Sequence, residues 1–449
     1  MNFRAAAAAV SLLLAVCAMP WAQQPAPAPP GAGTPETAPP LSTAAERVYD
    51  FAKPRILQVR TLLQAAGRQT TIGSGFIVGA DGLAITNYHV VSQFALDPRT
   101  YRLEYLAPDG ASGPLTLLAI DVANDLAVVK VEHAGLPQFE FEPRALAGRL
   151  PKGERIYAMG NPLDLGFTIV EGTYNGLVDK SYDERIHFSG AINPGMSGGP
   201  VTAADGRVVG INVAKRVGGE QVGFLVPARH AAALLERARA GPPLVVDKAR
   251  EEVGRQLDAW QAAFYDALRK EAFRAAPFGP YRGLESKAPW MTCWASTNAD
   301  RVPKPRTAVN MTQCSSTTGL FVSNRILTGR LDLSYAYYQA VDLNAFQFAK
   351  ELSQRAPGPA SDPQGGRRLT AQECHDDFVG AGEGHPPLRA TWCMRAYRDF
   401  EGIYDATLLV LTQDRGREAL LAQLTMQGVS QANAVATGRR FIEAIEWSR

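Results

Sequence analysis

One serine stands between glycines in residues 190–201, Gly-Ala-Ile-Asn-Pro-Gly-Met-Ser-Gly-Gly-Pro-Val, where Ser197 follows a Pro-Gly turn and precedes an apolar run. Glycines let a backbone adopt positive φ and approach a ligand closely. A serine hydroxyl is a weak nucleophile by itself and needs a base that a third group orients. Ser197 therefore indicates nucleophilic chemistry only if the chain supplies a base and an acid elsewhere.

His89 is the candidate base among the six histidines of the chain. It lies in the run Thr-Asn-Tyr-His-Val-Val at the end of an apolar strand expected over Leu83–Val91. A lone histidine in such a place would more often be a packed core residue, so the interpretation depends on its context. The remaining histidines have no partner motif and are interpreted as structural: His133, His187, His230, His375 and His385.

Asp125 is the candidate orienting acid, because it stands at the mouth of the apolar run Leu-Ala-Val-Val-Lys. A carboxylate there can be buried and still accept a hydrogen bond from an imidazole Nδ1–H. Asp121 competes for the role. It lies before the loop rather than at the strand, and is interpreted as a turn or surface residue.

The elements that must position these residues form two sets of short strands, rich in β-branched residues and broken by glycine or polar turns. Each set is large enough for one closed barrel or sandwich. The first set is expected at Arg55–Leu63, Thr70–Val78, Leu83–Val91, Tyr101–Ala107, Leu115–Ile120 and Leu126–Glu132. The second set is expected at Arg155–Met159, Phe167–Gly172, Gly176–Val178, Arg185–Phe188, Val208–Val213 and Val222–Val226.

Three helices are expected around these strands, at Leu41–Phe51, Arg229–Arg239 and Val246–Ala272. The third carries one apolar stripe at spacings of three and four. Packing on a neighbouring domain and self-association as a coiled coil both explain the stripe. Its aromatic members favour packing on a domain over a regular seam.

The last part of the chain, residues 276–449, mixes strands with helices and predicts an α+β domain. Removing the N-terminal leader leaves four cysteines, an even number that suggests two disulfides in an exported chain. Three pairings are open, and we expect Cys293 with Cys314 and Cys374 with Cys393 because these close the shortest loops. A zinc site competes, but no C-x-x-C is present, so neither a metal nor another cofactor is expected. Strands are expected at Phe321–Leu327, Leu331–Ala340, Arg389–Arg395, Tyr404–Leu411 and Leu420–Met426, and helices near Leu343–Arg355 and Ala432–Trp447.

The N-terminus reads as a targeting segment, in which Arg4 precedes an apolar stretch and Ala22 marks a cleavage point. This predicts a signal peptide over 1–22 and a Pro/Ala-rich linker over 23–41, and therefore an exported, periplasmic protein with no stable membrane span. Lipid anchoring through Cys17 is the alternative. The net charge of +2 argues against a nucleic-acid partner.

Four segments in order resemble the HtrA (Deg) type of trypsin-like serine protease: Gly-Ser-Gly-Phe-Ile-Val from Gly73, Thr-Asn-Tyr-His-Val-Val from Thr86, Asn-Asp-Leu-Ala-Val-Val-Lys from Asn124 and Asn-Pro-Gly-Met-Ser-Gly-Gly-Pro-Val from Asn193. The resemblance covers about Glu46 to Arg239. It implies a multidomain protein with an all-β double β-barrel protease domain over 42–240, a connecting helix over 244–275 and the disulfide-containing α+β domain over 276–449.

The resemblance also implies roles: Ser197 as nucleophile, His89 as proton acceptor and donor, and Asp125 as the residue that holds the imidazole. The backbone N–H groups of Gly195 and Ser197 would form the oxyanion hole. By position, the pocket for the residue before the cut would be lined by Ala191, Val213, Ala214 and Phe224. None of these is charged, which favours a small or medium aliphatic side chain over Lys or Arg.

Two features depart from related enzymes. Met196 stands where digestive trypsin-like enzymes carry the Asp that pairs with a new N-terminus, so that mode of activation is excluded, and HtrA-type enzymes usually carry Asn there. No carboxylate-binding loop of a PDZ domain is recognisable after Gly241. Family members often trimerise through the segment before the first barrel, and the short Leu41–Phe51 segment gives no basis to assume this here.

The sequence thus predicts an exported serine endopeptidase that acts on proteins or peptides, with a role in envelope protein quality control. The alternative is a protease-like binding or chaperone protein of the cell envelope with weak or no proteolysis.

Overall fold

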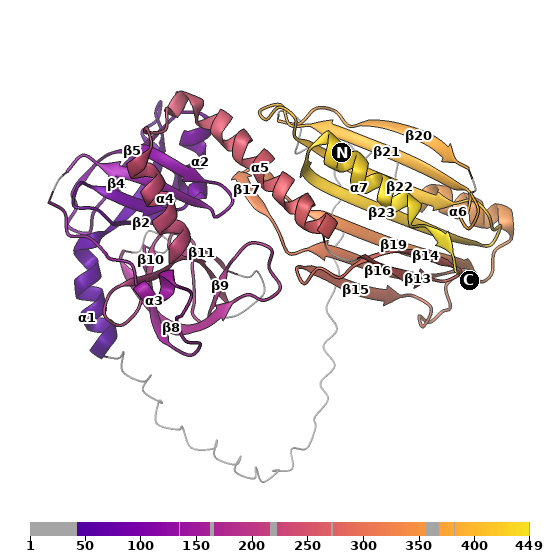
Figure 1. The fold of residues 1–449 in the computed structure, drawn as a ribbon, viewed down its shortest axis with the longest axis horizontal. Coiled ribbons are helices and arrows are strands. Elements are labelled where there is room, and N and C mark those ends of the chain that lie inside the picture. The colour runs from indigo at the N-terminus through magenta and orange to yellow at the C-terminus, as the bar shows by residue number, and fades with distance from the viewer. Residues whose placement is uncertain are drawn as a thin grey trace, which may run out of the picture. The chain divides into compact units, whose positions relative to one another are not determined.

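The structure, a computed structural model, describes residues 43–133, 135–161, 166–215, 222–270, 273–355, 368–380 and 382–448. The predicted signal peptide, the linker and Cys17 lie outside the described residues. The described chain contains two β-barrels, a long helix and a β-rich C-terminal part, which confirms the predicted fold class (Figure 1). In these segments no helix combines the length and the apolar character needed to cross a membrane.

The first closed barrel has the strand order β1-β2-β3-β6-β5-β4, with all neighbours antiparallel. Helix α1 (Thr43–Ala52) precedes it, close to the helix expected at Leu41–Phe51. The strands are β1 (Ile56–Leu63), β2 (Arg68–Ile77), β3 (Leu83–Thr86), β4 (Tyr101–Leu106), β5 (Ser112–Asp121) and β6 (Leu126–Val131).

The expected strand Leu83–Val91 is wrong in its second half. β3 ends at Thr86, Asn87 is extended (φ −84°, ψ 150°), and helix α2 (Tyr88–Leu96) begins at the next residue. Val90 and Val91 are β-branched, which favours a strand, but both are fully buried on the helix face that packs into the barrel core. His89 therefore lies in the first turn of a helix rather than at the end of a strand.

The second closed barrel has the order β10-β11-β12-β9-β8-β7. Its β8 unites the two strands expected at Phe167–Gly172 and Gly176–Val178, because the chain continues through an irregularity in the pairing with β9. The expected strand at Val208–Val213 extends to Lys215. The strands are β7 (Arg155–Gly160), β8 (Thr168–Leu177), β9 (Ile186–Phe188), β10 (Pro200–Thr202), β11 (Val208–Lys215) and β12 (Gly223–Pro227), with the short helix α3 (Pro143–Leu146) before them.

The strands are continuous apolar runs in the sequence because both faces of the sheet are buried. Successive side chains of a strand point to opposite faces. Val129 joins the interior of the first barrel, whereas its neighbour Val128 joins a second cluster that includes Met159 and Val226 of the second barrel. Both faces are thus buried, and the shared cluster holds the two barrels together.

Helix α4 (Ala228–Ala240) follows the second barrel, and helix α5 (Ala249–Lys270) follows a 3-10 turn at Val246–Lys248. The predicted stripe of α5 is buried from Ala249 to Leu268, within a cluster that also holds residues of the first barrel and of the C-terminal sheet. The domain-packing interpretation of this stripe is therefore the one that the structure supports.

The C-terminal part is built on a seven-stranded sheet with the order β15-β16-β19-β23-β22-β21-β20. Helix α7 lies along β22 and β23 (Figure 1). The sheet comprises β15 (Met291–Thr297), β16 (Thr307–Ser316), β19 (Leu331–Ala340), β20 (Glu373–Val379), β21 (Leu388–Ala396), β22 (Tyr404–Thr412) and β23 (Glu418–Val429), and the helices here are α6 (Ala345–Arg355) and α7 (Gln431–Glu443).

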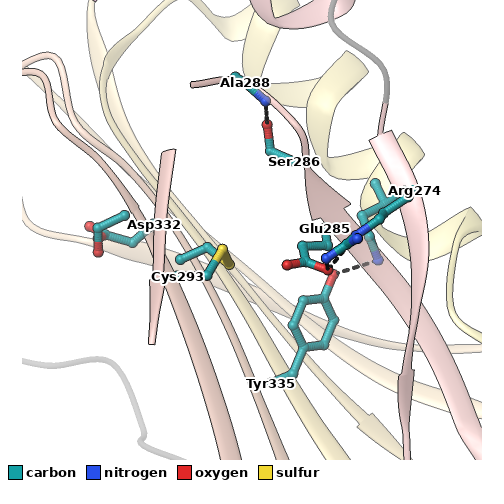
Figure 2. The surroundings of a disulfide bond; sticks show 10 residues. Arg274, Glu285, Ser286, Ala288, Cys293, Asp332 and Tyr335 are labelled. Atoms are coloured by element: carbon teal, nitrogen blue, oxygen red, sulfur yellow. Dashed lines mark hydrogen bonds and ion pairs between the residues drawn. A yellow bond between two sulfur atoms is a disulfide. The ribbon is translucent and has the colours of Figure 1, made fainter. Parts of the chain in front are cut away.

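The two disulfides join Cys293 to Cys314 and Cys374 to Cys393, which confirms the sequential pairing. Each joins residues that lie directly opposite each other on an edge strand and its neighbour, and the two edges are opposite ends of the sheet. Figure 2 shows the surroundings of Cys293, where the Tyr335 hydroxyl accepts a hydrogen bond from the backbone N–H of Leu284 (2.9 Å). The described segments contain no group of three or more residues suited to hold a metal ion.

Two further strand predictions need correction. Phe321–Leu327 is not one strand but a hairpin, because the chain turns between β17 (Leu320–Ser323) and β18 (Ile326–Thr328). The helix expected over Ala432–Trp447 ends at Glu443, and β24 (Glu446–Trp447) then pairs with β14. A small antiparallel sheet that the sequence did not reveal contains β13 (Phe273–Phe278), β14 (Tyr281–Ser286) and β24.

Candidate active site

His89 and Asp125 form the most closely paired part of the site. The His89 Nδ1 lies 2.6 Å from Asp125 Oδ2, and the backbone N–H of His89 donates to Asp125 Oδ1 (2.8 Å). Both oxygens of the carboxylate are thus engaged by one residue. An imidazole held through Nδ1 in this way keeps Nε2 free for a proton from another group.

The backbone of Asp125, like its side chain, is held by hydrogen bonds. Its φ is +58°, in the left-handed region that residues other than glycine seldom adopt, although Asp and Asn enter it more readily than most. Its carbonyl accepts from Asn87 Nδ2 (2.7 Å) and from the N–H of Tyr88 (3.2 Å). The start of helix α2 therefore holds Asp125 at four points, two on its backbone carbonyl and two on its carboxylate.

Opposing effects set the pKa of His89. Burial lowers it, but the negative charge of Asp125 and the hydrogen bond with that carboxylate raise it, and together they outweigh burial. The pKa of His89 consequently lies above its ordinary value near 6.5. The imidazolium form is stabilised at this position.

The turn around Ser197 is held by backbone hydrogen bonds and by one buried hydroxyl. The N–H of Ser74 donates to the carbonyl of Ser197 (2.7 Å). The Ser74 hydroxyl donates to the carbonyl of Gly195 (2.7 Å) and accepts from the N–H of Asn161 (2.9 Å). Ser74 is fully buried, and its hydroxyl links strand β2 of the first barrel to the Ser197 turn and to Asn161, directly after β7.

Two glycines allow that turn to lie against the first barrel. Gly195 has φ +95° and Gly198 has φ +84°. A Cβ on Gly198 would lie 2.3 Å from the Ser74 carbonyl oxygen and 2.8 Å from the backbone nitrogen of Asn87. No side chain fits at position 198. Because glycine has none, the Ser197 turn can contact the segment that carries His89.

The hydroxyl of Ser197 bonds to the carbonyl of Val213, at the long distance of 3.5 Å. Across the segments that the structure describes, no hydrogen bond joins this hydroxyl to His89. In a protein without substrate such bonds are often long or misaligned and tighten when substrate binds. The site therefore has a formed His89–Asp125 pair beside a serine whose hydroxyl points to another partner.

The residues predicted to line the pocket are placed unequally. Val213 contacts Ser197 through its carbonyl, and Phe224 lies on β12, opposite Ala214 of β11. Ala191 is exposed. The Ala214 side chain lies outside the described residues.

The competing residues have partners of their own. Asp121 accepts hydrogen bonds from Asn124 (backbone N 3.0 Å, side-chain Nδ2 3.1 Å) and pairs with Arg237 (3.2 Å), so it is a turn residue, but at 9% exposure it is buried rather than on the surface. His230 Nε2 lies 2.7 Å from Glu184. Met196 is fully buried in the core of the second barrel, where a charged side chain would need a partner.

Comparison with models of known protein families indicates which kind of domain this part of the chain forms. Residues 73–211 match the family model of the trypsin-like peptidase domain. The chain contains a trypsin-like peptidase domain. This segment carries His89, Asp125, Ser197 and the bridging Ser74.

The relatives of this domain are named serine proteases. A putative serine protease HhoB from Synechocystis sp. is 38% identical over 172 residues, which is 36% of this chain and 39% of that protein. A probable periplasmic serine endoprotease DegP-like from Chlamydia pneumoniae is 32% identical over 178 residues, 38% of this chain and 35% of that protein. The chain spans less than half the length of these curated relatives.

A solved structure of the serine endoprotease from Yersinia pestis aligns with 45% of this chain and 69% of its own, with 26% identity and a TM-score of 0.39.

Sequence reasoning missed three residues that contact this site. Ser74 was visible in the Gly-Ser-Gly motif, but nothing in the motif shows a hydroxyl that bridges two segments. Gln256 of α5 accepts from the N–H of Val122 (2.8 Å) and donates to the carbonyl of Ile120 (2.9 Å), at the loop that leads to Asp125. Phe321 of β17 lies beside His89.

Proposed function

We propose that the chain is a serine endopeptidase that hydrolyses peptide bonds of protein or peptide substrates through His89, Asp125 and Ser197. The observation that carries the proposal is the His89–Asp125 pair, joined at 2.6 Å and placed against the Ser197 turn. The names of the relatives and the matching peptidase domain support the same reaction class.

In the proposed reaction, Ser197 Oγ attacks the carbonyl carbon of the peptide bond while its proton passes to His89 Nε2. Asp125 holds the imidazole and stabilises the imidazolium that forms. His89 then gives this proton to the departing amine as the C–N bond breaks and an acyl ester remains on Ser197. Water, deprotonated by His89, attacks the ester, and Ser197 recovers its proton as the acid product leaves.

We assign the N–H groups of Gly195 and Ser197 to the oxyanion that develops in these steps. Removing one such donor costs on the order of 3 kcal/mol of transition-state stabilisation. The hydrogen bond from Ser74 to the Gly195 carbonyl fixes the peptide at this turn, and so supports the geometry that the assignment requires. Binding of substrate would also have to turn the Ser197 hydroxyl from Val213 toward His89.

We infer an exported, periplasmic location, with protein quality control in the envelope as the role. The two disulfides fit an oxidising compartment, and one relative is named periplasmic. The uncharged residues Ala191, Val213, Ala214 and Phe224 support a preference for small or medium aliphatic side chains before the cut. Cleavage profiling that found a basic preference would overturn this part of the proposal.

The proposal is tested by labelling the full chain with a fluorophosphonate, which expels fluoride and leaves a phosphonyl group on an activated serine. Mass spectrometry is expected to find the group on Ser197, and Ser197→Ala is expected to abolish labelling and casein hydrolysis. If Ser197 stays unlabelled across pH values and added unfolded proteins, the endopeptidase assignment is wrong. Suppression of client aggregation by Ser197→Ala would then favour the binding or chaperone alternative.

A further inference from the structure

A hairpin from the C-terminal part of the chain lies beside the candidate base. This hairpin consists of β17 and β18, and β17 packs on α2, the helix that carries His89. The Phe321 ring meets the His89 ring edge to face, with centroids 5.7 Å apart and an interplanar angle of 69°. On the next residue, the Val322 carbonyl accepts a hydrogen bond from the hydroxyl of Tyr88 (3.0 Å).

We infer that Phe321, on the β17–β18 hairpin, is a positioning residue for His89 in the active site. The inference rests on the proposed function, in which His89 moves the proton of Ser197. It adds that a residue from outside the peptidase domain holds the base in place. The site would then be built from two parts of the chain, and the family model that ends at residue 211 includes only one of them.

The geometry gives Phe321 a task that Asp125 does not perform. Asp125 fixes His89 through Nδ1, but a single hydrogen-bonded edge still allows the ring to tilt about that contact. An aromatic edge-to-face contact adds a second restraint on the orientation of the ring.

The hairpin is firmly anchored, so its place beside His89 does not depend on Phe321 alone. Leu320 and Val322 are buried in the cluster that joins the first barrel to the C-terminal sheet. The hydroxyls of Thr328 and Tyr397 lie 2.9 Å apart and tie β18 to that sheet. Gly329, directly after β18, lies against the Trp260 ring of α5, where a Cβ would be 2.9 Å from the ring.

Titratable groups lie beside His89 on two elements, the segment before β6 and helix α2. Asp125 precedes β6 and raises the pKa of His89. Tyr88 precedes His89 on α2, and burial raises the pKa of its hydroxyl, an effect that Asp125 reinforces and Arg368 opposes. Phe321 itself is neutral. A change at Phe321 therefore alters the burial of His89 without adding or removing a charge.

Phe321→Ala tests the inference, with Leu327→Ala as the matched control. Leu327 lies directly opposite Phe321 in the hairpin but is 69% exposed. We expect Phe321→Ala to lower the rate of fluorophosphonate labelling of the full chain by about 2- to 10-fold. We expect Leu327→Ala to label at the wild-type rate. Phe321→Tyr keeps the ring and should restore most of the rate.

A second readout separates positioning of His89 from mere support of the fold. Burial is the largest influence on the pKa of His89 and lowers it. Phe321→Ala should therefore move the acid limb of the labelling rate to higher pH, whereas loss of folded protein would reduce the amplitude at every pH. The pKa of the His89 ring, followed by NMR in histidine-labelled full-length protein, should shift in the same direction.

The outcomes distinguish this inference from the proposed function. If wild-type Ser197 is not labelled, the endopeptidase proposal fails, and the NMR titration still tests whether Phe321 controls His89. If wild type is labelled and Phe321→Ala matches it in rate and in acid limb, the positioning role is overturned. A Phe321→Ala protein that does not fold leaves the test to Phe321→Leu, which keeps apolar bulk but lacks the ring edge, and a labelling rate equal to that of wild type there also overturns the inference.

Discussion

The two halves of the candidate site are held in different ways. On the first barrel, His89 and Asp125 engage each other through side chains and backbone, with a shortest contact of 2.6 Å. On the second barrel, the Ser197 turn depends on backbone hydrogen bonds and on the hydroxyl of Ser74, and the Ser197 hydroxyl has only a long bond of 3.5 Å to Val213. In the proposed reaction, the His89–Asp125 half already has its hydrogen bonds, whereas the Ser197 hydroxyl must still turn from Val213 toward His89.

The largest effect on activity is expected from Asp125→Asn, which disrupts the His89–Asp125 pair. Asn keeps the size of the side chain and tolerates positive φ, but it cannot stabilise an imidazolium and it favours the wrong tautomer of His89. We expect kcat/KM for a peptide substrate to fall on the order of 10⁴-fold. A loss of less than about tenfold, measured alongside wild type at the same pH, would show that Asp125 does not orient the base.

Ser74→Ala should weaken the nucleophile half. The change leaves the part-buried Gly195 carbonyl and Asn161 N–H without the hydroxyl that joins them, and leaving a buried polar group unpaired costs up to about 1–3 kcal/mol. We expect kcat to fall roughly 5- to 100-fold with a smaller change in KM. Ser353→Ala, on the exposed face of α6, is the matched control and should behave as wild type. Equal activity of both variants would remove Ser74 from the site.

The pH dependence of kcat/KM should distinguish the two halves, because a variant in each half is expected to affect its acid limb differently. His89 must be neutral to accept a proton, and its raised pKa means that kcat/KM falls as the pH drops through a value above 6.5. In Asp125→Asn the raising charge is gone while burial remains, so the residual acid limb should move to lower pH. In Ser74→Ala the limb should stay in place. A wild-type limb below 6.5 would contradict this account of the pair.

The smallest effect is expected from Gln256→Ala. Gln256 of α5 bonds to the backbone at Ile120 and Val122, before the loop that carries Asp125. Without it that loop should loosen, and we expect a loss of about 2- to 5-fold in kcat/KM, consistent with one partly exposed hydrogen-bonding side chain. Gln354→Ala, at an exposed position of α6, is the control. If kcat/KM of Gln256→Ala equals that of Gln354→Ala, helix α5 has no influence on the His89–Asp125 pair.

The sequence predicted the local parts of this molecule well. The segments around His89, Asp125 and Ser197 are short and could be found one at a time, and the strand after Asp125 was placed almost to the residue. The disulfides were predictable because sequential pairing closes the shortest loops. His89 was placed on the wrong element, since Val90 and Val91 favour a strand where the extended Asn87 starts a helix.

Contacts between distant segments could not be predicted. The Tyr88 hydroxyl and the Val322 carbonyl are separated by 234 positions. The turn inside the Phe321–Leu327 run was missed, although Asn324, a residue type common in turns, lies at its middle. Strand β20 was missed because every residue from Glu373 to Val379 is exposed, so its side chains show no alternation. Ser74 was missed for a related reason, because a small hydroxyl gives no sign in the sequence of the two backbone groups that it joins.

Asp125 has a further consequence for how this site can change over time. It is the one residue other than glycine with positive φ among the described segments, so the same position must satisfy both the proton chemistry and the shape of the loop. Most substitutions there would disturb the fold as well as the reaction. If the chain hydrolyses peptide bonds as proposed, a related protein that kept the barrel but lost this activity should carry Asn or Gly at this position, and that replacement would identify it.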